Sequence, residues 1–373
     1  MAQKLLNIKI GKIIRGNLKM RNVRVGIWGF GAMGSGMAKM LLKKKGIEIV
    51  GVCDMHPDRV NKSIYDVLGC EKEERREVII KSDADVVFTD ECADVVLLAT
   101  DSFTKGAFDK IKLILEKKIN VISTAEEMAY PKAQEPELAK KLDEIAKANG
   151  VSVLGTGINP GFVLDLLILA LSGTCEEVDY IKAARVNDLS PFGTAVMVEQ
   201  GVGATKEVFE KGVEDGSIAG HVGFPESINM ITEGIGWNLE KIDQTREPIM
   251  SNVYRKSEYA EVQAGNVAGC KQCGYGYVDG VMKIEMEHPQ QILPQLEGLS
   301  TGDYVSIKGV PNIDLQITPE IPGGIGTIAM CINSIPHVIN AIPGLKTMLD
   351  IPVPRAMMGD VRELVLLKES AKA

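Results

Sequence analysis

The segment Val23-Arg-Val-Gly-Ile-Trp-Gly-Phe-Gly-Ala-Met-Gly34 joins a short apolar run to three glycines spaced as Gly29-x-Gly31-x-x-Gly34. A helical pattern follows to residue 44, so the segment predicts a strand, a tight turn and a helix. In this arrangement Gly29 permits the turn, Gly31 lets the backbone approach a pyrophosphate, and Gly34 lets the helix pack against the strand. The N-terminus of the helix then faces the phosphates of a dinucleotide.

Asp54 strengthens this interpretation, because it ends a second apolar run, 47–53, and lies 20 residues after Gly34. A carboxylate at that position accepts hydrogen bonds from an adenosine ribose and repels a 2′-phosphate, which favours NAD. His56 and Arg59 follow closely and leave NADP possible. The alternative is a glycine turn in an α/β fold that binds no nucleotide. We expect cofactor contacts from Gly29, Phe30, Gly31, Ala32, Met33, Gly34, Asp54, Arg59, Thr100 and Thr124.

The chain then alternates strands and helices up to residue 156, as the doubly wound parallel sheet of a Rossmann fold (class α/β) requires. Ligands bind at the carboxyl ends of such strands, so the loops 99–102 and 123–127 are expected to face the cofactor. Strands are expected at 23–28, 48–53, 86–88, 95–99, 120–123 and 152–154, and helices at 33–44, 104–117 and 134–149.

An α+β domain for substrate binding and dimerisation is expected after a glycine- and proline-rich corner, Gly155-Thr-Gly-Ile-Asn-Pro-Gly-Phe162. An apolar last helix, 328–342, is expected to return to the Rossmann domain. The predicted parts are an N-terminal extension 1–20, a Rossmann domain 21–156, the α+β domain 157–320 and a C-terminal segment 321–373. Within the second domain we expect strands at 178–188, 259–267, 275–288, 304–308 and 312–318, and helices at 163–171, 204–215 and 225–234.

Composition narrows the classes of function for these 373 residues. A net charge of −8 and a pI near 5.3 argue against nucleic acid as a partner, and no apolar run reaches the length of a membrane span. Seven cysteines, without a secretory signal, indicate reduced thiols in the cytoplasm. Cys270-Lys-Gln-Cys273 has metal or redox spacing but no second pair, so we interpret it as two thiols in a glycine-rich loop and expect no metal.

Glu126 and Glu127 are the candidates for proton transfer, because they directly follow the strand 120–123 at the ligand-facing edge of the sheet. A partly desolvated carboxylate in that place has a raised pKa and acts as an acid or a base. The alternative is an acidic helix N-terminus with no catalytic role. The spacing alone leaves both interpretations open.

Arg185 and Asn187 lie on one face of the predicted strand 178–188 and can bind a substrate carboxylate. An arginine on a solvated sheet face is the alternative. A glycine-rich segment, Gly323-Gly-Ile-Gly-Thr327, precedes the last predicted helix. Its free N–H donors can contact an anion, and the alternative is a simple helix cap. Of the four histidines only His221, among small residues, is a site candidate, and an exposed loop histidine is its alternative.

Together these motifs resemble the 2,4-diaminopentanoate dehydrogenases, in the wider group of dihydrodipicolinate reductase-like enzymes and native amine dehydrogenases. The basic motif of true dihydrodipicolinate reductases is not found, which speaks against ring reduction. The resemblance extends over nearly all of the chain after Met20. It rests on Gly29-Phe-Gly-Ala-Met-Gly34, Ser123-Thr-Ala-Glu-Glu127, Gly155-Thr-Gly-Ile-Asn-Pro-Gly-Phe162, Ala184-Arg-Val-Asn187 and Gly323-Gly-Ile-Gly-Thr327.

The resemblance implies NAD(P)-dependent oxidative deamination of 2,4-diaminopentanoate at C4 by a homodimer, as in ornithine breakdown. It implies that Glu126 is the carboxylate beside the reacting amine. The carboxylate end of the substrate would contact Arg185, Asn187 and Thr327, and other polar groups would contact Asn159 and His221. Two alternatives are a dehydrogenase of homoserine or an aspartate-derived aldehyde, and a dinucleotide-binding sensor without catalytic activity.

Overall fold

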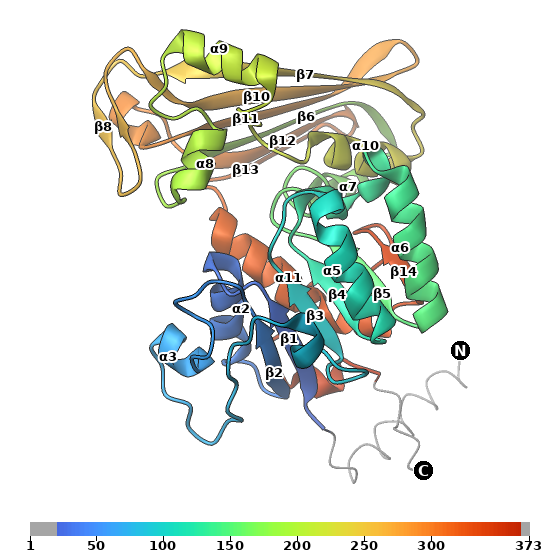
Figure 1. Cartoon of the computed structure of the whole chain (residues 1–373). Coiled ribbons are helices and arrows are strands. Elements are labelled where there is room, and N and C mark those ends of the chain that lie inside the picture. Colours follow the sequence, from blue (N-terminus) through green and yellow to red (C-terminus); the bar gives the residue numbers. More distant parts are fainter. Residues whose placement is uncertain (1–20, 367–373) are drawn as a thin grey trace.

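The structure is a computed structural model that describes residues 21–366, so the expected extension 1–20 lies outside the described residues. Two sheets stand one above the other, each with its own helices (Figure 1). The lower sheet is the predicted Rossmann domain, and all of its strands are parallel. Its order is β14-β5-β4-β3-β1-β2, with β1 (Val23–Trp28), β2 (Ile47–Cys53), β3 (Val95–Leu98), β4 (Asn120–Ser123), β5 (Ser152–Gly155) and β14 (Gly344–Lys346).

Helices cover both faces of this sheet because its strands are apolar on both sides. On one face Val96 and Leu98 of β3 pack in a core with Ile111 of α5 and Leu142 of α6. On the other face Val25 and Ile27 of β1 pack against α2 and α11. The helices are α2 (Ala32–Leu41), α3 (Ile64–Leu68), α4 (Ala84–Val87), α5 (Thr104–Glu116), α6 (Pro136–Asn149) and α11 (Gly323–Asn340).

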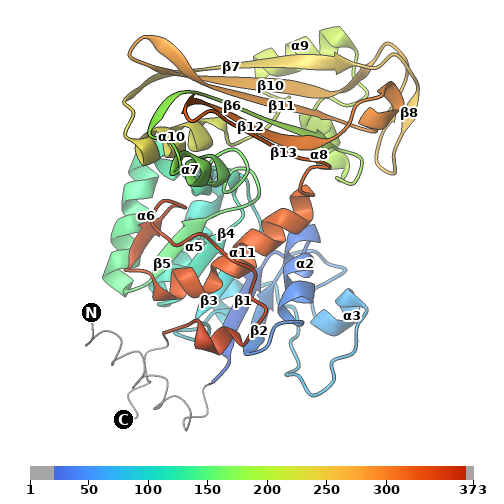
Figure 2. The ribbon, with the colours of Figure 1, turned by 180° about the vertical axis from the view of Figure 1, so that it is seen from behind.

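The C-terminal helix returns to the Rossmann domain, as expected. Figure 2 shows α11 running from the upper sheet down across the back of the lower one. It lies close to α2, where a Cβ on Gly36 would meet the Ile328 side chain at 2.4 Å. Beyond α11, β14 pairs with β5, so the last part of the chain also supplies an edge strand. Two short 3₁₀ turns follow β4, η1 (Glu126–Ala129) and η2 (Pro131–Ala133), and η4 (Val361–Glu363) lies near the C-terminus.

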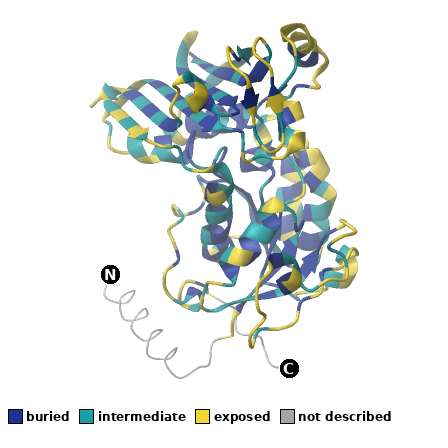
Figure 3. Cartoon of the chain, turned by 90° about the vertical axis from the view of Figure 1, so that its left-hand side faces the viewer, coloured by how far each residue is buried: buried dark blue, intermediate teal, exposed yellow. Residues whose placement is uncertain are grey.

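The second domain contains a mixed sheet in the order β13-β12-β6-β11-β10-β7, in which only the β6–β11 pair is parallel. Along β6, Ile181, Ala183, Arg185 and Asn187 are buried and alternate with half-buried residues, as predicted; Figure 3 shows the same alternation as stripes across the sheet. The strands are β6 (Glu177–Asp188), β7 (Leu239–Met250), β10 (Val267–Val278), β11 (Val281–Gln291), β12 (Gly302–Val310) and β13 (Ile313–Ile317).

Helices α7 and α10 pack on the inner face of this sheet, and α9 packs against β7. Helices α8 and α9 lie in the connection between β6 and α10, with α8 below α9 in Figure 1. Within residues 21–366 the structure contains no helix that is long and apolar enough to cross a membrane. The smaller elements are α7 (Leu166–Ser172), α8 (Thr194–Glu199), α9 (Lys206–Asp215), α10 (Phe224–Ile235), β8 (Arg255–Lys256), β9 (Glu261–Val262) and η3 (Pro294–Glu297).

Several predicted elements are wrong. Residues 86–88 belong to the short helix α4 and its end, because Asp83 caps that helix by accepting from Asp85 N at 3.0 Å. The predicted strand 275–288 is two strands, since Asp279 and Gly280 adopt positive φ and turn the chain into a hairpin. The predicted strand 259–267 contains only β9 and the first residue of β10. Strand β7 was missed, and Cys270 and Cys273 lie in β10 rather than in a loop.

Candidate active site

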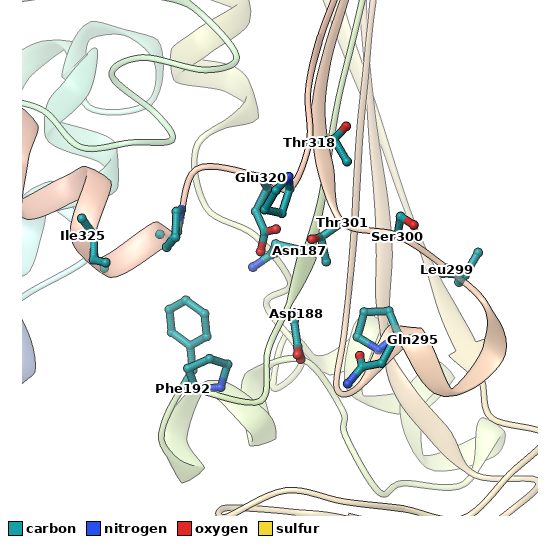
Figure 4. Close-up of a pocket in the computed structure, with 16 residues that line it drawn as sticks. Asn187, Asp188, Phe192, Gln295, Leu299, Ser300, Thr301, Thr318, Glu320 and Ile325 are labelled. Atoms are coloured by element: carbon teal, nitrogen blue, oxygen red, sulfur yellow. The ribbon is translucent and has the colours of Figure 1, made fainter.

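A cavity of about 480 Å³ lies between the two domains. The Rossmann domain lines it with the loops at the carboxyl ends of its strands, which include Thr100, Thr124 and Glu126. The second domain contributes Arg185, Asn187, His221 and His288, and α11 contributes Thr327. A wider hollow of about 750 Å³ adjoins it and shares Asn187 and Phe192 with it; Figure 4 shows both among the residues that line the hollow. We assign the site to the smaller cavity because the predicted polar residues converge there.

The glycine turn fits a pyrophosphate. Gly29 has φ +91° and no room for a side chain, since a Cβ would lie 2.4 Å from Ala99 O. At Gly34 a Cβ would lie 1.8 Å from Gly29 O, so close packing requires glycine there too. At Gly31 a Cβ would meet nothing nearer than Arg59 Nη1 at 3.9 Å. Gly31 is therefore open on the side from which a phosphate would approach the N-terminus of α2.

Asp54 lies beside this turn and holds it. Its Oδ2 accepts from Phe30 N at 2.5 Å, and its Oδ1 accepts from His56 N at 2.7 Å. Arg59 Nη1 lies 3.5 Å from Oδ2, so a guanidinium accompanies the carboxylate at the predicted ribose position. The Phe30 side chain is buried in the core and its backbone N–H is bonded to Asp54, so neither group is free for a cofactor. Ala32 begins α2 at this turn, away from the cavity.

Three predicted cofactor residues line the cavity itself. Met33 lies at the start of α2, and its Cε would be 3.4 Å from a Cβ on Gly324 of α11. Thr124 donates from its hydroxyl to Leu98 O at 3.4 Å, and Thr100 donates to the Asp101 carboxylate. The predicted cofactor residues thus form two groups, one at the glycine turn and one at the ends of β3 and β4.

Glu126 and Glu127 have different environments. Glu127 accepts from Thr104 N at 2.7 Å and so satisfies the first turn of α5. Glu126 lines the cavity, and its buried Oε2 has no hydrogen-bond partner within residues 21–366. Burial raises the pKa of Glu126 to about 7, opposed by a hydrogen bond from Ser102 and assisted by the charges of Glu199 and Glu127. The geometry therefore favours Glu126 as the proton-transfer group.

His221 lines the cavity, so the interpretation as an exposed loop histidine is wrong. Burial, together with the charge of Arg185, lowers its pKa to about 3, so the ring is neutral. Asn159 Nδ2 lies 3.1 Å from His221 Nε2 and donates to it, and Asn159 Oδ1 has no partner within the described residues. This contact links the Asn-Pro-Gly-Phe corner to the second domain.

Arg185 is buried, with an exposed fraction of 2%, so the alternative of a solvated sheet face is wrong. Its Nη1 donates to Asp303 Oδ1 at 2.5 Å and its Nη2 donates to Ile321 O at 2.6 Å. Asp303 on β12 therefore balances the charge of the guanidinium that lines the cavity. Asn187 lies two residues along β6, and its buried Oδ1 has no partner in the described chain.

Helix α11 begins at Gly323, five residues before the predicted start, and no side chain caps it. Gly323 and Gly324 therefore lie in its first turn, where backbone N–H groups have no partner inside the helix. A Cβ on Gly323 would lie 4.0 Å from Arg185 Nη2, so the guanidinium and this helix N-terminus are neighbours. Thr327 Oγ1 accepts from Ile158 N at 3.1 Å and so joins α11 to the Asn-Pro-Gly corner.

The sequence interpretation missed several polar residues of the cavity, among them His288 and Gln200. His288 donates from Nδ1 to Arg185 O at 2.7 Å and meets His221 edge to face, with 4.6 Å between ring centres. Gln200, directly after α8, is buried and its Oε1 has no partner within residues 21–366. The alternation of β11 could have placed His288 on the inner face, had the hairpin been recognised. No local pattern distinguishes Gln200.

The chain is similar to known proteins over most of its length. The model of the 2,4-diaminopentanoate dehydrogenase C-terminal domain matches residues 162–367. The 2,4-diaminopentanoate dehydrogenase of Acetoanaerobium sticklandii is 61% identical over 354 residues, which is 95% of this chain and 99% of that protein. The chain belongs to the 2,4-diaminopentanoate dehydrogenase family.

Two amine dehydrogenases are more distant relatives of this family member. The amine dehydrogenase of Streptomyces virginiae is 28% identical over 247 residues, which is 61% of this chain and 67% of that protein. The solved structure of an amine dehydrogenase from Mycobacterium smegmatis has a TM-score of 0.80 at 26% identity, over 91% of this chain and 98% of that one. The similarity therefore extends over both domains.

Proposed function

We propose that the protein catalyses the NAD(P)-dependent oxidative deamination of 2,4-diaminopentanoate at C4. The products are 2-amino-4-oxopentanoate, ammonia and the reduced cofactor. The identity of 61% over nearly the full length of a 2,4-diaminopentanoate dehydrogenase supports the substrate. The open Gly31 above the N-terminus of α2 supports the dinucleotide.

One observation about the cavity carries the proposal. Four of its buried side-chain oxygens have no hydrogen-bond partner within residues 21–366, and all four are acceptors. A buried acceptor left without a donor costs about 1–3 kcal/mol, so such a site favours a ligand that is rich in donors. A substrate with two ammonium groups has this chemistry. The oxygens are Glu126 Oε2, Asn159 Oδ1, Asn187 Oδ1 and Gln200 Oε1.

Glu126 performs the proton transfers in this proposal. Oxidation of the amine removes a hydride from C4 and a proton from nitrogen, and the bound nicotinamide supplies the hydride acceptor. Glu126 takes the proton because its carboxylate lines the cavity at the end of β4 and lacks a donor. After Glu126 releases that proton, its carboxylate takes a proton from the water that adds to the C4 imine and passes it to the nitrogen, which leaves as ammonia. The pKa of Glu126, about 7, suits a group that both accepts and releases protons near neutrality.

The carboxylate end of the substrate binds to Arg185, Asn187 and Thr327 in this proposal. Because Asp303 already balances the charge of Arg185, the guanidinium contributes its remaining N–H donors rather than a net positive charge. The first-turn N–H groups of α11 lie next to Arg185 Nη2 and add donors of the same kind. Asn159 and His221 contact other polar groups of the substrate.

Asp54 and Arg59 together suggest that both NAD and NADP are accepted, with a preference for NAD. The carboxylate suits a ribose hydroxyl, and the guanidinium beside it suits a 2′-phosphate. The likeness to 2,4-diaminopentanoate dehydrogenase further supports a role in ornithine degradation in the cytoplasm. A homodimer formed through the second domain is part of the same proposal.

The experiment is an assay of NADH and NADPH formation with 2,4-diaminopentanoate, together with a measurement of the ammonia released. Reduced cofactor and ammonia in equal amounts are expected. Reduced cofactor formed with homoserine or an aspartate-derived aldehyde, but not with 2,4-diaminopentanoate, would indicate a dehydrogenase that acts on an alcohol or aldehyde. Cofactor binding without turnover would indicate a sensor, and either result would refute the proposal.

A further inference from the structure

The side-chain amide of Gln200 lies in the part of the cavity wall that the second domain supplies. It directly follows α8, with an exposed fraction of 4%, and lines the cavity with Glu199. Its Oε1 is buried without a partner in the described chain. Neither the catalytic carboxylate nor the carboxylate-binding groups account for this oxygen.

The backbone around Gln200 is firmly held. Gly220 N donates to Glu199 O at 3.1 Å, which ties the end of α8 to the loop that carries His221. Gly201 has φ +67°, and a Cβ there would lie 2.5 Å from the Phe209 ring, so the turn after Gln200 packs directly on α9. A side chain with a fixed backbone loses less entropy when it binds a ligand. Gln200 is therefore built as a preorganised contact.

Two side-chain oxygens still lack a donor when the amide nitrogen of Asn187 binds the substrate carboxylate, and their chemistry points to an ammonium group. Gln200 Oε1 and Asn187 Oδ1 both lie on the second-domain side of the cavity, and both need a donor. Glu126, on the Rossmann side of the cavity, binds the reacting ammonium at C4. The carboxylate of the substrate has no hydrogen to donate to these oxygens. The charge of Glu199, which reaches Glu126 across the cavity, also favours a cation there.

We propose that Gln200, with Asn187, binds the 2-ammonium group of the substrate and so selects diamino acids over monoamines. This inference rests on the proposed function. A hydrogen bond to a charged group typically changes binding by a factor of roughly 10 to 100. A site built around such a bond rejects the analogue that lacks the group, because its polar atoms are then left unpaired.

The test compares 2,4-diaminopentanoate with 4-aminopentanoate, which lacks only the 2-amino group. The variant Gln200→Met keeps the length of the side chain and removes the acceptor. We expect kcat/KM for the diamino acid to fall roughly 10- to 100-fold, with less than about a threefold change for 4-aminopentanoate. The monoamine is assayed both as substrate and as competitive inhibitor, so a value is obtained whether or not it turns over.

Two further variants complete the design. Gln200→Glu retains the acceptor and should preserve selectivity for the diamino acid. Gln263→Met makes the same change at an exposed residue that does not line the cavity, so the kinetics with both substrates should stay unchanged. The ratio of the two values in one preparation does not depend on the folded fraction. An unchanged ratio in Gln200→Met, while the native enzyme turns over 2,4-diaminopentanoate, would overturn the role of Gln200. No turnover by the native enzyme would instead refute the proposed function.

Discussion

Replacement of Glu126 by glutamine tests the catalytic proposal most directly. The amide has the same shape but cannot accept a proton at neutral pH. General acid–base catalysis contributes about 10²- to 10⁴-fold, so kcat should fall by about a hundredfold or more. NADH formation under saturating substrate measures the change. Because the substituted residue does not contribute to the glycine turn, the Kd for NADH should remain within about a factor of two.

The pH profile of the native enzyme gives a second measure of the same group. Burial raises the pKa of Glu126 to about 7, and a base must be ionised to act. Roughly a tenth of the carboxyl groups are ionised at pH 6 and roughly nine tenths at pH 8. The value of kcat/KM should therefore rise through pH 7 and level off. In Glu126→Gln this limb should disappear from the residual activity.

The pH dependence of stability provides the control against misfolding. The contribution of Glu126 to stability should fall over the pH range in which activity rises. The folded-state pKa of Glu126 lies above the ordinary value of 4.5, so the protonated acid favours the folded state below that pH. This contribution is lost as pH rises through about 7. A shift of this size corresponds to at most about 3 kcal/mol. Glu126→Gln should thus be more stable than the native protein at pH 8 by up to that amount, as urea denaturation would show.

Glu127→Gln is the matched control. Its amide oxygen can still accept from Thr104 N, so the start of α5 should remain intact. Removal of its charge should lower the pKa of Glu126 slightly and move the acidic limb to lower pH, with kcat within about a factor of three. A large loss in Glu127→Gln, or near-normal activity in Glu126→Gln, would refute the assignment.

Four other substitutions test the geometry around the site. Gly31→Ala should fold normally and weaken NADH binding roughly tenfold, as fluorescence titration would show. Gly34→Ala should destabilise the fold because its Cβ meets Gly29 O, as thermal denaturation would show. Arg59→Ala should raise KM for NADP roughly tenfold and leave KM for NAD within twofold, as steady-state kinetics would show. Asp303→Asn should cost about 3–5 kcal/mol of stability in urea denaturation, because it leaves a buried guanidinium unpaired.

The Rossmann half of the fold was predictable because its signals are local. The spacing of Gly29, Gly31 and Gly34 and the apolar strand runs lie within single elements, and the structure confirms them. The secondary-structure predictions failed where a turn or a helix cap overrode the apolar pattern of a predicted strand. The turn at Asp279 divided one predicted strand into two, and the cap at Asp83 converted another into a helix.

The partners of the site residues were not predictable, because strand pairing brings them together across the chain. Asp303 pairs with Arg185 in the register between β12 and β6, 118 positions away. That pairing changes the interpretation of Arg185 from a free cation to a neutralised donor. Gln200 enters the cavity from the end of α8 through packing against α9, which no sequence period reveals.

The charge balance of the cavity explains how one site could bind a diamino acid and also activate it. Asp303 balances Arg185, and burial keeps His221 neutral by lowering its pKa to about 3. Glu126 and Glu199 remain, so the cavity favours a cation. An ammonium group that enters beside Glu126 stabilises its carboxylate and lowers its pKa. Burial holds Glu126 partly protonated without substrate, and the bound ammonium raises the fraction that is ionised and able to accept a proton.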